Sequence, residues 1–175
     1  MMTPPPVPLL IISGSLGTGK TTVLNEATDL LTEAGIPHAA IDLDALAVMH
    51  PREDPHGERL AFANLAAVWP NYAAAGAERL IVARVVEGLG ELDDYRAAVP
   101  GAEIVVCRLT APVWLMHERL RVREPGMFLD AALARAAELD GILARAGVED
   151  FVVDNGPGRS VGDVAREALG RAGWV

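Results

Sequence analysis

The sequence predicts an α/β fold in which helices cover both faces of a five-stranded parallel sheet. Short apolar runs alternate with longer amphipathic segments along the chain, no repeat or linker interrupts them, and 175 residues is the size of one domain. Parallel strands joined by right-handed crossovers place the intervening helices on both faces of the sheet. We therefore expect three layers and a single domain, residues 1–175.

Five short apolar runs have the length of buried strands. The first ends at a glycine, the second in an acidic sequence and the third in an arginine. The expected strands are residues 7–13, 37–43, 78–85, 102–109 and 148–154. Ligands of such sheets bind beyond the carboxyl ends of the strands, so the residues that follow each run are the candidates for a site.

Six intervening segments have helical apolar spacing or helix-start signals. They are residues 20–33, 58–75, 91–99, 112–124, 130–146 and 160–172. Pro70 must end or kink the second of them, whereas the proline that opens the fourth suits a first helical turn. We expect Phe62, Trp69 and Tyr72 to be core residues, because aromatic side chains at helical spacing are usually buried.

Composition and charge exclude several classes of protein. The net charge of −9 argues against nucleic acid or an anionic membrane surface as a partner. No apolar run approaches the roughly 20 residues of a membrane helix, and residues 1–13 lack the basic region of a signal peptide, so we expect a cytoplasmic protein. The single cysteine, Cys107, lies in an apolar run and is expected to be a buried, inert thiol.

A phosphate-binding loop follows the first expected strand. The segment from Gly14 to Thr21, G-S-L-G-T-G-K-T, matches G-x-x-x-x-G-K-[ST] between an apolar run and an amphipathic helix. Its Lys20 is the sole lysine of the chain. Backbone N–H groups of such a loop cradle phosphates, the lysine reaches the β- and γ-phosphates, and Thr21 can coordinate Mg²⁺. The expected ATP-binding residues here are Gly14, Ser15, Leu16, Gly17, Thr18, Gly19, Lys20, Thr21 and Thr22.

The rest of the chain narrows the class of nucleotide-binding protein. A guanine-specific N-K-x-D motif is impossible without a second lysine, and the third strand ends in Arg84, where large motor ATPases carry an acidic residue. The chain is also short for such machines. Of these classes of nucleotide-binding protein, only a compact phosphotransferase remains.

The whole chain resembles the small-molecule kinases of the gluconate kinase and shikimate kinase group, with chloramphenicol phosphotransferase-like proteins nearby. The resemblance rests on the phosphate-binding loop, D-L-D at 42–44, L-I-V-A-R at 80–84 with D-Y-R at 94–96, and R-L-R-V-R-E-P-G-M-F at 119–128. It implies an ATP-dependent kinase with the P-loop fold, an acceptor-binding helical segment at about 45–77 and a short lid at about 119–130. In this group the acidic pair holds substrate and Mg²⁺, and lid arginines clamp phosphates.

The markers of each known acceptor class are missing. The D-G-(F/Y)-P-R segment of nucleoside monophosphate kinases is absent, and V-E-G-L-G at 86–90 replaces the triple glycine of shikimate kinases. Met127 and Phe128 stand where gluconate kinases carry a histidine and an aromatic residue. The sequence therefore does not identify the acceptor.

The acidic pair is expected to act at the γ-phosphate. Asp42 and Asp44 are two residues apart at a strand end, so their side chains can point the same way. We favour Asp42 as the metal-side group and Asp44 as the base that takes a proton from the acceptor. The alternative is that Asp44 caps a short helix over residues 45–49.

Arginines supply the remaining candidates. Arg84 needs an anionic partner, which is substrate, Asp44 or Glu87. Arg119 and Arg123 share a helix face and are expected to stabilise the transferring phosphoryl group; the alternative is an ion pair with Glu118 or Glu124.

Two loops add further candidates. In the resembling kinases the loop at 155–159 packs the adenine, so Arg159 is expected to bind ATP, although an ordinary loop is equally compatible. His50, Arg52 and His56 are candidates for the acceptor pocket, with Arg52 as the preferred substrate contact, although solvated loop residues are the more common case.

Three functions remain open. The first is a kinase that moves the ATP γ-phosphate to a hydroxyl or acid group of a small molecule. The second is a nucleotide-binding switch or slow ATPase that acts on a protein partner. The third is an antibiotic- or toxin-type phosphotransferase, which the sequence does not separate from the first. The oligomeric state stays open.

Overall fold

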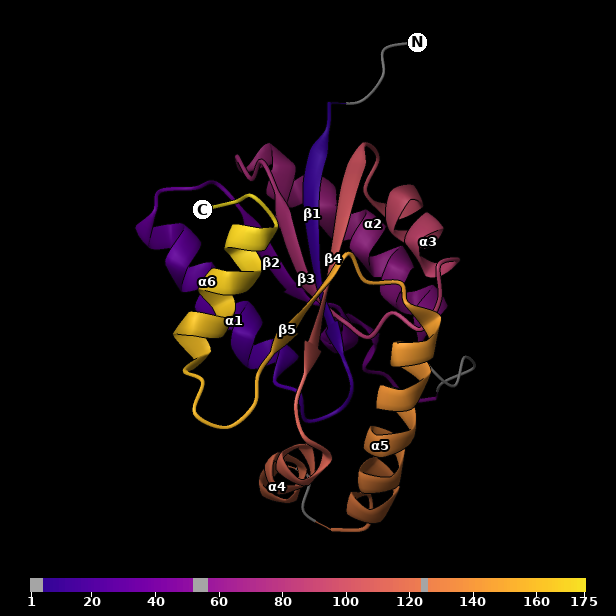
Figure 1. Ribbon diagram of the computed structural model, residues 1–175. Helices are drawn as coiled ribbons and strands as arrows, with labels where there is room; N and C mark the ends of the chain where they lie inside the picture. Colours follow the sequence, from indigo (N-terminus) through magenta and orange to yellow (C-terminus); the bar gives the residue numbers. More distant parts are fainter. Residues whose placement is uncertain (1–4, 52–56, 124–125) are drawn as a thin grey trace.

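A single parallel sheet forms the centre of the molecule. The computed structural model describes residues 5–51, 57–123 and 126–175, and within them five strands lie in the order β2-β3-β1-β4-β5 (Figure 1). The strands are β1 (Val7–Gly14), β2 (Ala39–Asp42), β3 (Leu80–Ala83), β4 (Ala102–Thr110) and β5 (Phe151–Asp154). All neighbouring strands are parallel, so every carboxyl end lies at the same edge, with the end of β1 in the middle. The predicted five-stranded parallel sheet is confirmed.

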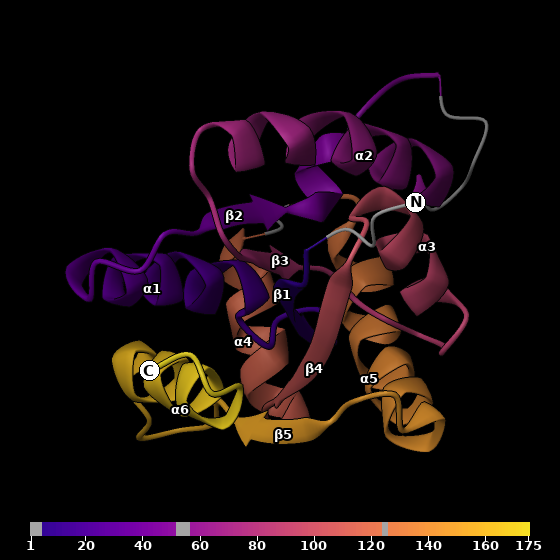
Figure 2. The same cartoon turned by 90° about the horizontal axis from the view of Figure 1, so that it is seen from above.

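Helices cover both faces of this sheet. The described α-helices are α1 (Lys20–Glu33), α2 (Glu58–Ala74), α3 (Glu91–Ala98), α4 (Val113–Arg123), α5 (Leu129–Ala146) and α6 (Val161–Arg171). Helices α1 and α6 lie on one face, and α2 and α3 lie on the other (Figure 2). Helices α4 and α5 pack on each other, with α4 at the end of the molecule where the strands finish. The expected three layers are confirmed.

Alternating side chains of β1 build the two halves of the core. Leu9 and Ile11 pack toward α2 and α3, whereas Leu10 and Ile12 pack toward α1 and α6. All four are at most 1% exposed. This burial on both faces explains why the strand reads as a continuous apolar run, as parallel strands with two covered faces do. The central strand that carries the phosphate-binding loop is therefore fixed on both sides.

Helix α2 differs from the expectation at its end. Pro70 does not end the helix, which continues to Ala74. Because Pro70 lies on the exposed side of α2, the hydrogen bond that it cannot donate is lost where water can replace it. The last turn is exposed throughout, so Tyr72 is 39% exposed and its expected place in the core was wrong, whereas Trp69 is buried and Phe62 packs against the core.

Two smaller expectations concern buried and membrane-spanning segments. Cys107 is fully buried on β4, and burial raises the pKa of its thiol to about 12, so the expected inert thiol is confirmed. No helix in the described parts of the chain combines the length and apolar character that crossing a membrane requires.

Candidate active site

The phosphate-binding loop joins β1 to α1 in a conformation that only glycine suits. Gly17 has φ 80° and Gly19 has φ 93°, in the left-handed region that side chains rarely adopt. A Cβ on Gly17 would lie 2.6 Å from the carbonyl oxygen of Met116, and one on Gly19 would lie 2.6 Å from Nδ2 of Asn155. The loop is thus closely covered by α4 on one side and by the segment after β5 on the other.

Buried hydrogen bonds hold the loop in place. The Thr18 hydroxyl donates to the carbonyl of Ser15 (2.7 Å), and the Ser15 hydroxyl donates to the carbonyl of Ala136 in α5 (2.6 Å). The Asn155 side-chain amide donates to the carbonyl of Thr18 (2.7 Å). All three side chains are at most 4% exposed. Ser15 and Thr18 therefore fix the loop with their side chains.

Asn155 is a site residue whose individual part the sequence did not reveal. The sequence places it in the loop after β5, where it was grouped with the adenine-side segment. Its amide reaches back to a loop that lies 137 positions earlier, and this pairing depends on the neighbourhood of β1, β4 and β5 in the sheet. The one signal available in the sequence was a polar residue directly after a strand end.

The Lys20 ammonium lies within the phosphate-binding loop. Its Nζ donates to the carbonyls of Gly14 (2.9 Å) and Ser15 (3.0 Å). The pKa of Lys20 is lowered to about 8, mainly by burial and also by Arg123, while Asp44 and Asp42 act in the opposite direction. Lys20 therefore interacts electrostatically both with the acidic pair and with Arg123 of α4.

Asp42 and Thr21 form the candidate metal side. The Thr21 hydroxyl donates to Oδ2 of Asp42 at 2.8 Å. A hydroxyl and a carboxylate oxygen are the hard donors that Mg²⁺ prefers. The described residues contain no group of three or more histidine, cysteine or acidic side chains that would hold a metal ion by themselves. This pair therefore fits an ion that takes most of its ligands from phosphate oxygens and water.

Asp44 and Arg84 form an ion pair at the carboxyl ends of β2 and β3. Nη1 of Arg84 donates to Oδ1 of Asp44 at 2.9 Å. The alternative of Asp44 as a helix cap is wrong: it lies inside the 3₁₀ turn η1 (Leu43–Ala47), where Asp42 precedes the turn and makes no side-chain cap. The other candidate partner of Arg84, Glu87, pairs with Arg135 at 2.8 Å.

A small cavity opens beside this ion pair. Its volume is about 140 Å³, and it is lined by Asp44, Glu58, Arg84, Val85, Glu87 and Glu91. Burial is the main cause that raises the pKa of the Glu91 carboxyl. Four of the six lining residues are acidic, and they come from η1, α2, α3 and the segment after β3.

A second cavity lies between the phosphate-binding loop and α4. It has a volume of about 260 Å³ and is lined by Gly17, Gly19, Thr22, Arg119, Leu120, Arg123, Asn155 and Val161. Arg119 bridges its walls, since Nη1 donates to the carbonyl of Gly17 (3.2 Å) and Nη2 to that of Asn155 (3.0 Å). Arg119 therefore donates to two backbone carbonyls and does not form the ion pair with Glu118 that was the alternative expectation. Burial lowers the pKa of Arg119.

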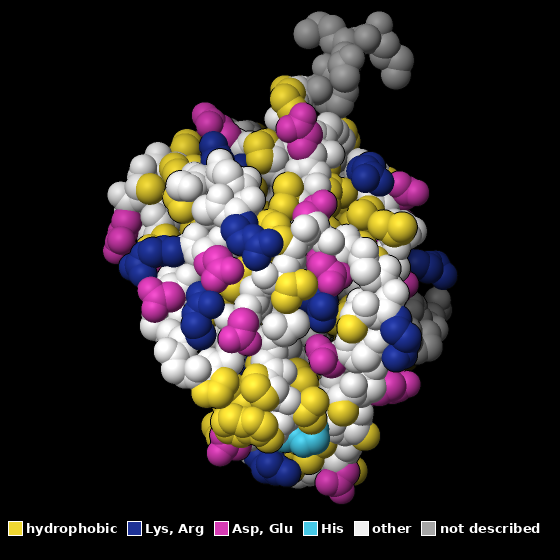
Figure 3. Space-filling view, viewed as in Figure 1, with side chains coloured by type: hydrophobic (Ala, Val, Ile, Leu, Met, Phe, Trp, Pro, Cys, Tyr) yellow, Lys and Arg dark blue, Asp and Glu magenta, His cyan; other side chains and the backbone are white. Residues whose placement is uncertain are grey.

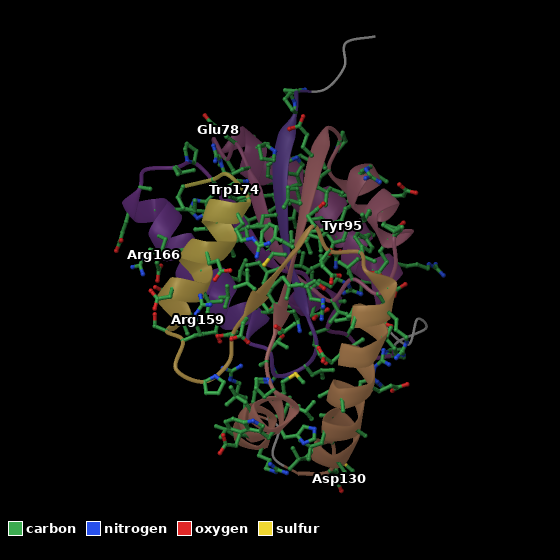
Figure 4. All side chains as sticks on the ribbon, viewed as in Figure 1. Glu78, Tyr95, Asp130, Arg159, Arg166 and Trp174 are labelled. Carbon is green, nitrogen blue, oxygen red and sulfur yellow. The ribbon has the colours of Figure 1, made fainter. Side chains whose placement is uncertain are left out.

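Several expected site residues lie elsewhere. Arg159 donates to Glu167 of α6 at 2.8 Å and is absent from the described lining of the second cavity (Figure 4). His50 is exposed, while Arg52, His56 and Glu124 lie outside the described residues. Trp114 and Val122 of α4 are exposed apolar side chains, and Figure 3 shows apolar side chains gathered at the lower end of the molecule, where Figure 1 places α4.

Comparisons with known sequences and structures differ in outcome. No protein-family model and no curated protein sequence matches the chain. Solved structures do match over nearly its whole length.

Three solved structures illustrate this similarity. A gluconokinase from Sinorhizobium meliloti 1021 has a TM-score of 0.63 at 19% identity, covering 99% of this chain and 94% of its own. The Deinococcus radiodurans tunicamycin resistance protein has a TM-score of 0.65 at 18% identity, covering 97% of both chains. A shikimate kinase from Bacteroides thetaiotaomicron has a TM-score of 0.62 at 14% identity, covering 93% and 97%. The chain therefore has the fold of the P-loop small-molecule kinases, the group that its sequence resembles.

Proposed function

We propose that this chain is an ATP-dependent phosphotransferase that moves the γ-phosphoryl group of ATP to a hydroxyl or acid group of a small acceptor. The observation that carries this proposal is the position of Lys20, which interacts electrostatically with Asp44 in one cavity and with Arg123 in the other. A lysine of this loop contacts the β- and γ-phosphates. The γ-phosphate would then lie between a nucleotide cavity and an acceptor cavity.

The larger cavity suits the nucleotide. It adjoins the phosphate-binding loop and the amino-terminal end of α1, where backbone N–H groups and the helix dipole favour anions. Arg119 and Arg123 on its wall supply positive charge where charge develops on the transferring group. Bound Mg²⁺, held through Thr21 and Asp42 and by phosphate oxygens, would neutralise charge between the β- and γ-phosphates.

The smaller cavity suits the acceptor, with Asp44 as the base. The acceptor hydroxyl gives its proton to the Asp44 carboxylate while its oxygen forms the new bond to the γ-phosphorus. The bond between that phosphorus and the oxygen bridging to the β-phosphate breaks, and its electron pair leaves with ADP. Arg84 holds the Asp44 carboxylate in place, and the hydrogen bond from Thr21 to Asp42 supports the metal-side assignment of Asp42.

ADP release from Mg-ATP, with and without pooled acceptors, tests this function. The pools are nucleosides and nucleotides, sugar acids and shikimate-like polyols, and hydroxylated antibiotics. We expect one pool to raise turnover well above the acceptor-free rate. Asp44→Asn should abolish this increase but retain ATP binding, and Lys20→Ala should weaken ATP binding. A flat response to every pool, with slow basal hydrolysis and tight ATP binding, would favour a nucleotide-gated binding module instead.

A further inference from the structure

Among the described residues that line the smaller cavity, no positive side chain is left unpaired for an anionic acceptor. Arg84 is the only positive side chain in the cavity lining that the structure describes, and its guanidinium already pairs with Asp44 at 2.9 Å. Glu87 is neutralised separately, by Arg135 at 2.8 Å. Glu58 and Glu91 remain as two acidic side chains of the lining whose charges no described ion pair balances.

Glu91 is held in a fixed position by its own loop. Its Oε1 accepts hydrogen bonds from the backbone N–H groups of Glu87 (2.6 Å) and Gly88 (3.1 Å). Glu58 lies in the first turn of α2, and its charge adds to burial in raising the pKa of Glu91. The two carboxylates come from different helices and line the same cavity, where a cation between them would relieve the repulsion of like charges.

A buried hydroxyl without a partner lies among the same residues. The Tyr95 side chain is fully buried, and its hydroxyl makes no hydrogen bond to any described residue. The hydroxyl interacts electrostatically with Arg84, Glu91 and Asp44, three residues that line this cavity. Figure 4 shows Tyr95 between the sheet and α3. An unpaired buried hydroxyl is unusual in a folded protein and indicates a polar group still to be bound.

We propose that the acceptor is a small hydroxylated molecule that carries a protonated amine, and that Glu58 and Glu91 select it by charge. This inference rests on the proposed function, because it concerns the acceptor of the same reaction. The amine lies between the two carboxylates, and the acceptor hydroxyl lies at Asp44, which takes its proton during transfer. A carboxylate or phosphate at the position of the amine would face unpaired negative charge, and it is disfavoured there.

Binding of three sugars of similar size, measured without nucleotide, tests the charge preference. D-glucosamine, D-glucose and D-glucuronate differ mainly in charge. The amide signals of Glu87 and Gly88, which report on the Glu91 carboxylate, can be followed by NMR at constant ionic strength. We expect saturable shifts with D-glucosamine at a concentration at least roughly tenfold lower than with D-glucuronate. Equal affinities, a preference for D-glucuronate, or no saturable shift with D-glucosamine would each overturn the proposal.

Matched variants assign the preference to the two carboxylates. Glu58→Gln and Glu91→Gln should each reduce the preference for D-glucosamine, and the double variant should reduce it to about twofold or less. Glutamine at 91 keeps an oxygen that can accept both backbone hydrogen bonds, and Glu58 is exposed, so both variants should fold. The control is Glu78→Gln, an exposed residue at the opposite end of the molecule from α4, which should retain the full preference (Figure 4).

The two proposals fail in different ways. A preference for D-glucosamine without acceptor-dependent ADP release would refute the kinase and leave the charge selection standing. ADP release that sugar acids stimulate and amino sugars do not would refute the charge selection and leave the kinase standing.

Discussion

The guanidinium of Arg84 and the carboxylate of Asp44 form an ion pair whose partners differ in exposure, with 7% of the Arg84 side chain accessible and 60% of that of Asp44. The pair joins the end of β3 to the turn that follows β2. Arg84 also lies 5.9 Å from the centre of the Phe62 ring. A buried cation thus holds an exposed carboxylate in the position proposed for the base.

This difference predicts unequal costs for the two partners. Asp44→Ala leaves a buried guanidinium unpaired and should lower the free energy of unfolding by about 3 kcal/mol. Arg84→Met leaves a carboxylate that water can solvate, so its cost should be about 1 kcal/mol. Urea denaturation measures both. The control is Asp93→Ala, which breaks the exposed pair with Arg96 and should cost no more than about 0.5 kcal/mol. Equal costs at 44 and 84 would contradict this account.

The lowered pKa of Lys20 predicts that nucleotide affinity depends on pH. The protonated ammonium binds phosphate, and burial brings its pKa to about 8 in the free protein. Affinity for ADP should therefore level off well below pH 8 and fall as the pH rises through this value, by up to about tenfold per pH unit above it. Calorimetry between pH 7 and about 9.5 measures this dependence. Lys20→Arg, which stays charged, should bind ADP more weakly, but its affinity should not change with pH. An affinity of the wild-type protein that does not change with pH would contradict the prediction.

Asn155 should be required for the shape of the phosphate-binding loop. Asn155→Asp replaces the amide donor with a carboxylate that faces the carbonyl of Thr18, 2.7 Å from the original nitrogen. The buried mismatch should cost about 2 kcal/mol of folding free energy and weaken ADP binding. Asn71→Asp is the matched control, because the Asn71 amide is exposed and donates to the carbonyl of Ala67. That variant should lose at most about 0.5 kcal/mol and bind ADP normally. Similar losses in both variants would refute the assigned role.

Two of the arginines of α4, Arg119 and Arg121, should differ in their effect on nucleotide binding. Arg119 lines the larger cavity and bridges the carbonyls of Gly17 and Asn155, whereas Arg121 is exposed. Arg119→Met should raise the Kd for ADP about tenfold, which corresponds to about 1.4 kcal/mol. Arg121→Met keeps the helix and its exposed surface and should leave the Kd unchanged. Equal effects would show that α4 contributes only general positive charge.

The phosphate-binding loop and the order of strands and helices could be predicted because their causes are local. Gly17, Gly19 and Lys20 lie within a few residues of one another in the sequence. The apolar run of β1 reflects the burial of this strand on both of its faces. The wrong expectation for Tyr72, in contrast, has a cause that is not local in the sequence. Its spacing on α2 was that of a core residue, and only the extent of the sheet decided that the last turn of this helix is exposed.

The sequence by itself determined a P-loop α/β domain, because hydrophobic periodicity and a glycine-rich loop act over a few residues. Only the tertiary structure decided the partner of Arg84 and brought Glu58 and Glu91 to one cavity. These residues lie on different elements, and their distances depend on the order of strands in the sheet and on which face each helix covers. Ion pairs between residues so far apart in the sequence cannot be predicted from local sequence patterns, because they form only when the helices pack on the sheet.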